Sequence, residues 1–241
     1  MLSLQRFEGH PSWATGTTLI GDAEWHYVEI KAIIHDTTGS IEVRLDGSTE
    51  ITFNGDTRNG GSGVINRLVV MREAAGFSSG DEIRQHDIYV CDSSGSVANN
   101  FLGPVRVGAL FPSGSGNSTQ WTPSAGSNYQ TIDEAAPNGD TDYNESTTPG
   151  NIDTVAMGNL PVSAAAIYGI QHLTYARKTD AGARTLRQVI RSGGTNFEGP
   201  DLTVLDTYKY FLKTYTLDPA TNAAWTESGI NALEAGYKDQ A

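Results

Sequence analysis

Apolar and polar residues alternate over residues 25–34, where every second side chain from position 28 onward is apolar. Successive side chains of a strand point to opposite faces, so this pattern predicts a half-buried strand. Glu29 and Lys31 fall on the other face, which we expect to be solvated. The predicted buried face consists of Val28, Ile30, Ala32 and Ile34.

Two antiparallel connections are predicted after this strand. A turn-like sequence at 36–39 leads to an alternating run over 41–45, and an Asp-Gly pair at 46–47 separates that run from a third one over 51–53. Asp-Gly between alternating runs is typical of a tight hairpin. The apolar positions of the two later runs are Ile41, Val43, Leu45, Ile51 and Phe53. Glu42 and Glu50 are expected on solvated faces.

Further short strands are predicted at 64–71, 87–91 and 105–110. Segments rich in Gly, Ser and Asp separate them. Several short strands with turn signals between them favour an antiparallel β-sandwich.

Residues 113–151 are rich in Ser, Thr, Asn, Gly and Pro, and we interpret them as a polar linker. A structureless loop of this length is uncommon inside a compact domain, so the segment either joins two domains or wraps over a neighbouring surface. Trp121, Tyr129 and Tyr143 are its candidate anchors or glycan contacts, and anchoring is the reading that we favour.

A second β-rich unit is predicted beyond the linker, from runs at 165–177, 184–191 and 205–217. The last run places one apolar set on a single face. That set is Tyr208, Tyr210 and Leu212.

One short helix is predicted near the end of the sequence. Thr226 is the expected N-cap, Ile230 and Leu233 are the expected buried residues, and Gly236 is the expected stop. Trp225 is expected in the core of this unit, and Trp25 in the core of the first.

The charge, the apolar runs and the cysteine content of the sequence argue against several classes of function. Sixteen basic and 28 acidic residues give a net charge of −12, which repels phosphate backbones and argues against direct nucleic-acid binding. No signal peptide and no run of about 18 apolar residues is present, so we predict neither export nor membrane insertion. Cys91 is the only cysteine, and we predict a buried structural thiol.

Three stretches resemble parts of a known group of proteins. Residues 25–47 read WHYVEIKAIIHDTTGSIEVRLDG, and residues 86–114 read HDIYVCDSSGSVANNFLGPVRVGALFPSG. Both resemble the later strands of laminin-G/concanavalin A-like jelly rolls in bacteriophage structural proteins. The stretch DPATNAAWTESGINALEAGYK, residues 218–238, is similar to the C-terminal signature of the same virion proteins, which are described as tail, fibre or decoration components.

The resemblance covers roughly residues 20–112 and 150–238, and it implies a concanavalin A-like sandwich followed by a second β-rich unit. With the polar linker between them, the predicted domains are residues 1–112, 113–151 and 152–241. It further implies a surface-exposed virion protein of the head, collar or tail, assembled in the host cytoplasm. The implied partners are other virion proteins and copies of the chain itself, with a host-surface glycan as a further candidate. Because few residues precede position 25, the sandwich is expected to be trimmed or to be completed by another segment or subunit.

The sequence lacks the residue patterns of common catalytic sites. Glu29, Glu42 and Glu50 are isolated, and the adjacent Asp133 and Glu134 lie in the predicted linker, so we find no carboxylate pair of the glycosidase kind. Nucleotide-binding loops, nucleophile elbows and zinc spacings are also missing. The five histidines, which are scattered, are His10, His26, His35, His86 and His172.

We therefore predict no enzymatic activity, no cofactor and no metal. Calcium held by oxygen ligands is the alternative reading of one polar cluster, and its residues are Asp87, Asp92, Asn99 and Asn100. A glycan-binding adhesin and a polysaccharide hydrolase on the same fold are the two alternatives to a structural role.

Overall fold

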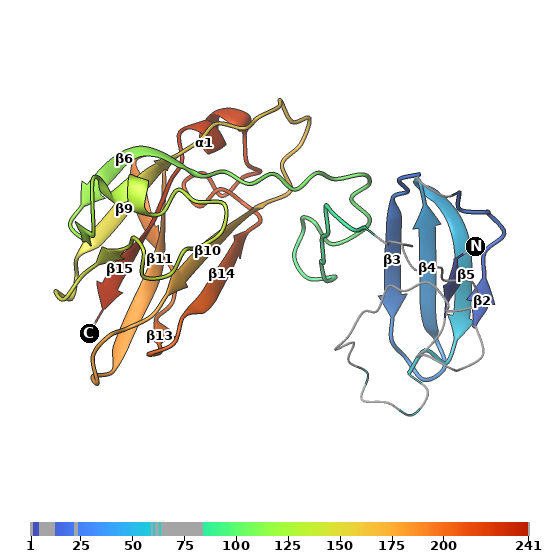
Figure 1. The fold of residues 1–241 in the computed structure, drawn as a ribbon. Helices are drawn as coiled ribbons and strands as arrows, with labels where there is room; N and C mark the ends of the chain where they lie inside the picture. Colours follow the sequence, from blue (N-terminus) through green and yellow to red (C-terminus); the bar gives the residue numbers. More distant parts are fainter. Residues whose placement is uncertain are drawn as a thin grey trace. The chain divides into compact units, whose positions relative to one another are not determined.

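The computed structural model describes residues 2–4, 13–21, 24–58, 60, 63 and 84–240. The chain divides into two units, residues 1–107 and 108–241. Both are built from antiparallel strands, and the described residues contain one short α-helix, so the predicted all-β fold class is confirmed (Figure 1). The strand predicted at 64–71 lies outside the described residues.

The first unit contains a three-stranded meander, β3 (Val28–Ile33), β4 (Gly39–Leu45) and β5 (Ser48–Gly55). Asp46 and Gly47 both have positive φ, as a tight primed hairpin turn requires. The predicted connections and the inward positions of β4 and β5 are confirmed, because Ile41, Val43 and Ile51 form a buried cluster. β1 (Ser3–Leu4) pairs with β2 (Ala14–Thr15), and in or next to these strands Leu2, Trp13 and Ala14 pack against that cluster.

The prediction for β3 is wrong at three positions, although Ala32 packs against the buried cluster and Lys31 is exposed, as predicted. Glu29 is buried, whereas Val28 and Ile30 are 41% and 46% exposed. The Glu29 carboxylate accepts hydrogen bonds from the Tyr89 hydroxyl and from the amides of Leu102 and Gly103, the amides at 3.0 and 3.1 Å. Its burial is explained by donors 60 to 74 residues away, which alternation within the strand cannot reveal.

Residues 84–107 cross the polar face of this sheet as irregular chain, so the strands predicted at 87–91 and 105–110 do not form. The Phe101 ring lies 3.9 Å from the Arg44 guanidinium carbon, and Lys31 donates to Asn100 at 3.0 Å. Asp87 has a positive φ and accepts from the Val107 amide at 2.8 Å. Side-chain contacts therefore replace strand pairing here.

Two further predictions for the first unit are wrong. Cys91 is exposed, because its segment runs over the sheet surface. Trp25 is 62% exposed and lies against the His86 ring at 4.3 Å between centroids, so it is a surface residue and not a core residue.

Replacing Glu29 with Ala should loosen residues 84–107. Three donors lose their acceptor, and an unpaired part-buried donor costs about 1–3 kcal/mol. We expect faster amide hydrogen exchange in peptides that cover Leu102 and Gly103, measured by mass spectrometry. Glu29→Gln retains an acceptor oxygen and should exchange much more slowly than Glu29→Ala. Equal exchange in all three proteins would contradict this assignment.

The second unit contains a six-stranded antiparallel sheet. Its order is β12-β11-β15-β9-β6, and β13 also pairs with β11. These strands are β6 (Pro112–Thr119), β9 (Ile152–Met157), β11 (Arg184–Ser192), β12 (Thr195–Glu198), β13 (Leu202–Val204) and β15 (Glu234–Gln240). Only the strand at 184–191 was anticipated for this sheet from its apolar content.

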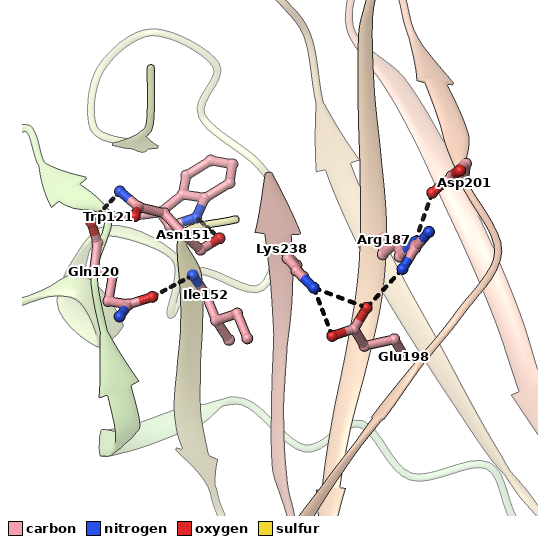
Figure 2. Close-up of polar contacts among 8 residues, drawn as sticks. All are labelled: Gln120, Trp121, Asn151, Ile152, Arg187, Glu198, Asp201 and Lys238. Atoms are coloured by element: carbon pink, nitrogen blue, oxygen red, sulfur yellow. Dashed lines mark hydrogen bonds and ion pairs between the residues drawn. The ribbon is translucent and has the colours of Figure 1, made fainter. Parts of the chain in front are cut away.

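Residues 113–151 are not a linker, because β6 pairs with β9 inside the second unit. The rest of the segment contains β7 (Thr122–Pro123), the 3-10 helix η1 (Asn128–Thr131) and β8 (Asn144–Glu145). Figure 2 shows two contacts that fix the segment: the Trp121 indole donates to the Asn151 carbonyl at 3.1 Å, and the Ile152 amide donates to Gln120 at 2.8 Å. The boundary between the two units falls after residue 107 and not after residue 112.

A second layer covers one face of the six-stranded sheet. It includes the two-stranded ribbon of β10 (Ile170–Ala176) and β14 (Lys209–Tyr215), which lies beside β11 (Figure 1). Phe211 of the ribbon packs with Leu186 and Val204 of the sheet. The layered arrangement that we predicted for the first unit is thus seen in the second.

The predicted helix is confirmed as α1 (Glu227–Asn231). The Thr226 hydroxyl accepts from the Gly229 amide at 3.0 Å, and Ile230 and Leu233 are buried with Trp225. The predicted stop is wrong, because Gly236 lies in the middle of β15.

Candidate functional site

The solvent side of the β10–β14 ribbon carries apolar side chains. The strand register places Leu173 opposite Leu212 and Tyr175 opposite Tyr210. These four side chains are 54%, 59%, 36% and 47% exposed, respectively. We call the surface formed by these four residues the outer ribbon face. Contiguous exposed apolar surface is uncommon on soluble proteins and marks interaction sites.

Alternation along each strand produces this face. In β14, Phe211 points inward and is buried, so its neighbours Tyr210 and Leu212 point outward. In β10, two inward positions are polar, His172 and Thr174, and Thr174 is buried opposite Phe211. The ribbon therefore carries apolar side chains on both sides, and those on its outer side are exposed to solvent.

A buried glutamine contacts the two polar inward positions of β10. Gln188 of β11 is 1% exposed, and its amide nitrogen lies 3.1 Å from the His172 carbonyl, 3.1 Å from the Thr174 hydroxyl and 3.2 Å from the Phe211 carbonyl. Buried amides require hydrogen-bond partners, so these contacts fix the ribbon on the sheet. They keep the outer ribbon face turned to solvent.

An ion pair lies at one end of the outer ribbon face. Arg177 places Nη2 at 2.9 Å from both carboxylate oxygens of Asp140, and the Tyr208 hydroxyl donates to the same carboxylate at 2.6 Å. These bonds, first that from Tyr208 and then that from Arg177, lower the pKa of Asp140. The Tyr208 ring stacks on Tyr175 with 4.7 Å between centroids and 8° between planes, and Tyr210 contacts Tyr175 at 4.5 Å.

The opposite end of the face is polar and uncharged. Gln171 and Thr214 are paired in the register and exposed. The apolar rows are thus enclosed between an ion pair and a neutral polar row.

The other outer surface of this unit, on the six-stranded sheet, is ion-paired. Figure 2 shows Arg187 between Asp201 and Glu198, at 2.6 and 2.8 Å, and Lys238 bound to Glu198 at 2.9 Å. The bond from Asp201, followed by that from Glu198, raises the pKa of Arg187. Charged surface of this kind is well solvated, so the two outer surfaces of the unit differ in chemistry.

The structure places the three predicted aromatic contacts in different surroundings. Trp121 packs with Leu186 and Phe211, and its indole contacts Tyr237 edge-on, so it anchors its segment inside the unit. Tyr129 is half-buried in η1. Tyr143 is 39% exposed. The use of Tyr129 and Tyr143 by a partner or a glycan stays a prediction.

Two ionisable groups on the inner side of the second unit have shifted pKa values. Asp153 of β9 is 1% exposed and accepts from the Asn128 amide at 2.9 and 3.0 Å. Burial raises the pKa of Asp153 to about 6, although hydrogen bonds from Asn128, from the Trp121 amide and from Tyr237 oppose the change. On the inner side of the ribbon, burial lowers the pKa of His172 to about 4, and Lys213 lowers it further.

The acidic loop after η1 is held by Asn138. Its amide donates to Glu134 at 2.8 Å and to Asp142. Burial, followed by the Asp142 carboxyl, raises the pKa of Glu134. The bridging amide closes the loop between residues 134 and 142.

Asp87 and Asp92 both accept backbone amides, from Val107 and Ser94 respectively. Within the described part of the chain, no three His, Cys, Asp or Glu side chains gather in a way that could hold a metal ion.

No helix among the described residues is long and apolar enough to cross a membrane.

Tyr208, Tyr210 and Leu212 lie on one face, as their spacing predicts. The rest of the site was missed, because Asp140 lies in the supposed linker and because strand pairing alone brings Leu173 and Tyr175 to the same surface. Comparisons with protein-family models, with curated proteins and with solved structures found no significant match.

Proposed function

We propose that this chain is a non-catalytic structural protein of a bacteriophage particle, exposed on the particle surface and acting by protein–protein assembly. The observation that carries the assembly role is the outer ribbon face, with Leu173 and Leu212 more than half exposed. The bacteriophage context comes from the resemblance of residues 25–47, 86–114 and 218–238 to virion proteins.

The composition of the face suits contact with protein. Tyr and Arg are enriched at protein interfaces, and tyrosine offers a large contact area with few rotatable bonds. Tyr175, Tyr208 and Tyr210 are already held against one another, and Arg177 is held by Asp140. Little side-chain entropy is then lost on binding, which favours association.

Mass spectrometry of purified particles tests this proposal. We expect peptides of the chain in gradient-purified virions at a stoichiometry typical of structural proteins, and labelling of intact virions by antibodies against it. Lysate from the same infection is the control for expression. Abundant chain in the lysate together with none in the particles would refute the structural role.

Glycan binding is the second candidate function. The Tyr208 ring beside the Asp140–Arg177 pair combines an aromatic surface with exposed polar groups, as saccharide sites do. This candidate predicts that immobilised host polysaccharide retains the chain and that Tyr208→Ala abolishes retention. An array of host-derived glycans with no retained chain would argue against it.

A further inference from the structure

We infer that the outer ribbon face binds the same face of a second copy of this chain. The inference rests on the proposed assembly role and names one partner for it. It starts from the order of side chains along the ribbon.

The outward side chains form four rows along the two strands. Leu173 with Leu212 and Tyr175 with Tyr210 are the two central rows. Gln171 with Thr214 flanks the leucine row. Just beyond the paired strands, Arg177 lies over the Tyr208 ring and flanks the tyrosine row. Successive rows are about 7 Å apart, so the four rows extend over about 20 Å.

This order is self-complementary under a two-fold axis. Consider an axis that runs across the strands, in the interface plane, between the leucine row and the tyrosine row. A rotation about this axis places Leu173 of one copy opposite Tyr175 of the other across the interface, and Leu212 opposite Tyr210. Sheets pack face to face at about 10 Å with nearly aligned strands, and isologous contact through one patch is the common form of a homodimer.

The same axis matches the polar ends. It brings Gln171 of one copy over Arg177 of the other, and Thr214 over Tyr208, beside the Asp140 carboxylate. A glutamine amide can accept from Arg177 and donate to Asp140, and no like charges in these rows are brought together. A two-fold axis along the strands would instead place each ion pair over the other.

The available area sets the strength of the contact. Four side chains, about half exposed, contribute on the order of 400 Å² of apolar surface per copy. Stable interfaces use about 800 Å² per partner, so the isolated dimer is weak, with dissociation in the micromolar range. Multiple copies fixed in a particle strengthen such a contact through effective concentration.

Sedimentation equilibrium of the full chain tests the contact. We expect the mass to rise from the 25.8 kDa monomer towards the dimer across the micromolar range. The double variant Leu173→Lys, Leu212→Lys should raise the dissociation constant of the dimer by at least about 100-fold. The reason is that each copy loses both of its leucine contacts with the other. Val162→Lys is the matched control, since Val162 is 69% exposed and lies outside the ribbon.

The symmetry is tested by disulfide trapping. Cys91 is exposed, so all proteins carry Cys91→Ser to prevent its own cross-links. We expect a mixture of Leu173→Cys and Tyr175→Cys proteins to form the mixed disulfide dimer. A disulfide formed preferentially between Leu173→Cys and Leu212→Cys proteins would overturn the stated axis.

A monomeric wild-type chain at every concentration would overturn the inference, and so would equal weakening by Val162→Lys. Retention of a monomeric chain on glycan through Tyr175 would also overturn it. The proposed function fails separately: a chain that dimerises as described but is absent from virions refutes the structural role alone. A virion protein that stays monomeric refutes only the self-contact.

Discussion

Replacing Gly236 with Ala is expected to unfold the second unit. Gly236 lies in β15 between β11 and β9, opposite Val189 and Thr154. A Cβ added there would lie far inside 3.0 Å of the Asp153 backbone carbonyl, a distance that real Cβ atoms do not show. β15 and β9 are both central strands, so neither can move away without breaking its hydrogen bonds to the neighbouring strands. We therefore expect the free energy of unfolding to fall by more than about 4 kcal/mol.

Gly114→Ala is the matched control for this variant. Gly114 also lies in a strand of the same sheet, β6, but its added Cβ would meet nothing closer than 4.0 Å. Circular dichroism during urea unfolding should show the loss for Gly236→Ala and a near-native transition for Gly114→Ala. Similar transitions for both variants would show that the close approach at Gly236 is relieved at little cost.

Asp153→Asn is expected to stabilise the second unit increasingly as the pH rises. The folded-state pKa of Asp153 is raised to about 6 from 3.8, so folding favours the protonated form. The wild type loses stability from this group as the pH rises from about 4 through 6, and Asn has no such titration. Between pH 4 and 7.5, the difference in unfolding free energy between variant and wild type should shift by about 2 kcal/mol in favour of the variant.

His172 titrates in the opposite sense and masks this effect in the wild type. Its folded-state pKa is lowered to about 4 from 6.5, so its contribution to stability is lost as the pH falls through that range. The readout is therefore the difference between Asp153→Asn and wild type at each pH, in which the His172 contribution cancels. A difference that is constant with pH would contradict a raised pKa at Asp153.

Alternation predicted the strands whose two faces have different surroundings. In β4, Ile41, Val43 and Leu45 are all buried, and Ser40, Glu42 and Arg44 lie between them at half-exposed positions. The same reasoning failed at Glu29 of β3, because a carboxylate can be buried when distant donors satisfy it. Tyr89, which donates to Glu29, lies 60 residues away in the sequence. The alternation of residues within β3 therefore cannot predict this hydrogen bond.

Composition misled the assignment of residues 113–151. The sequence of β6, PSGSGNST, resembles a flexible linker, yet Gly116 permits the close approach of β6 to Thr154. The helix was predictable because Thr226 and Ile230 act locally, through one cap and one buried face. The outer ribbon face was predictable only for β14, since the pairing of β10 with β14 joins residues up to 45 positions apart, Ile170 and Tyr215.

The order of strands in the six-stranded sheet also determines when it can form during synthesis. β15 is the last of these strands along the chain, and it occupies the position between β11 and β9. Until the ribosome has released residues 234–240, β9 and β11 each lack a neighbour on that side and expose unpaired backbone groups. About 80 residues must therefore be synthesised after β9 before these strand edges are covered. When several ribosomes translate one mRNA, the uncovered edges of neighbouring nascent chains can pair with one another.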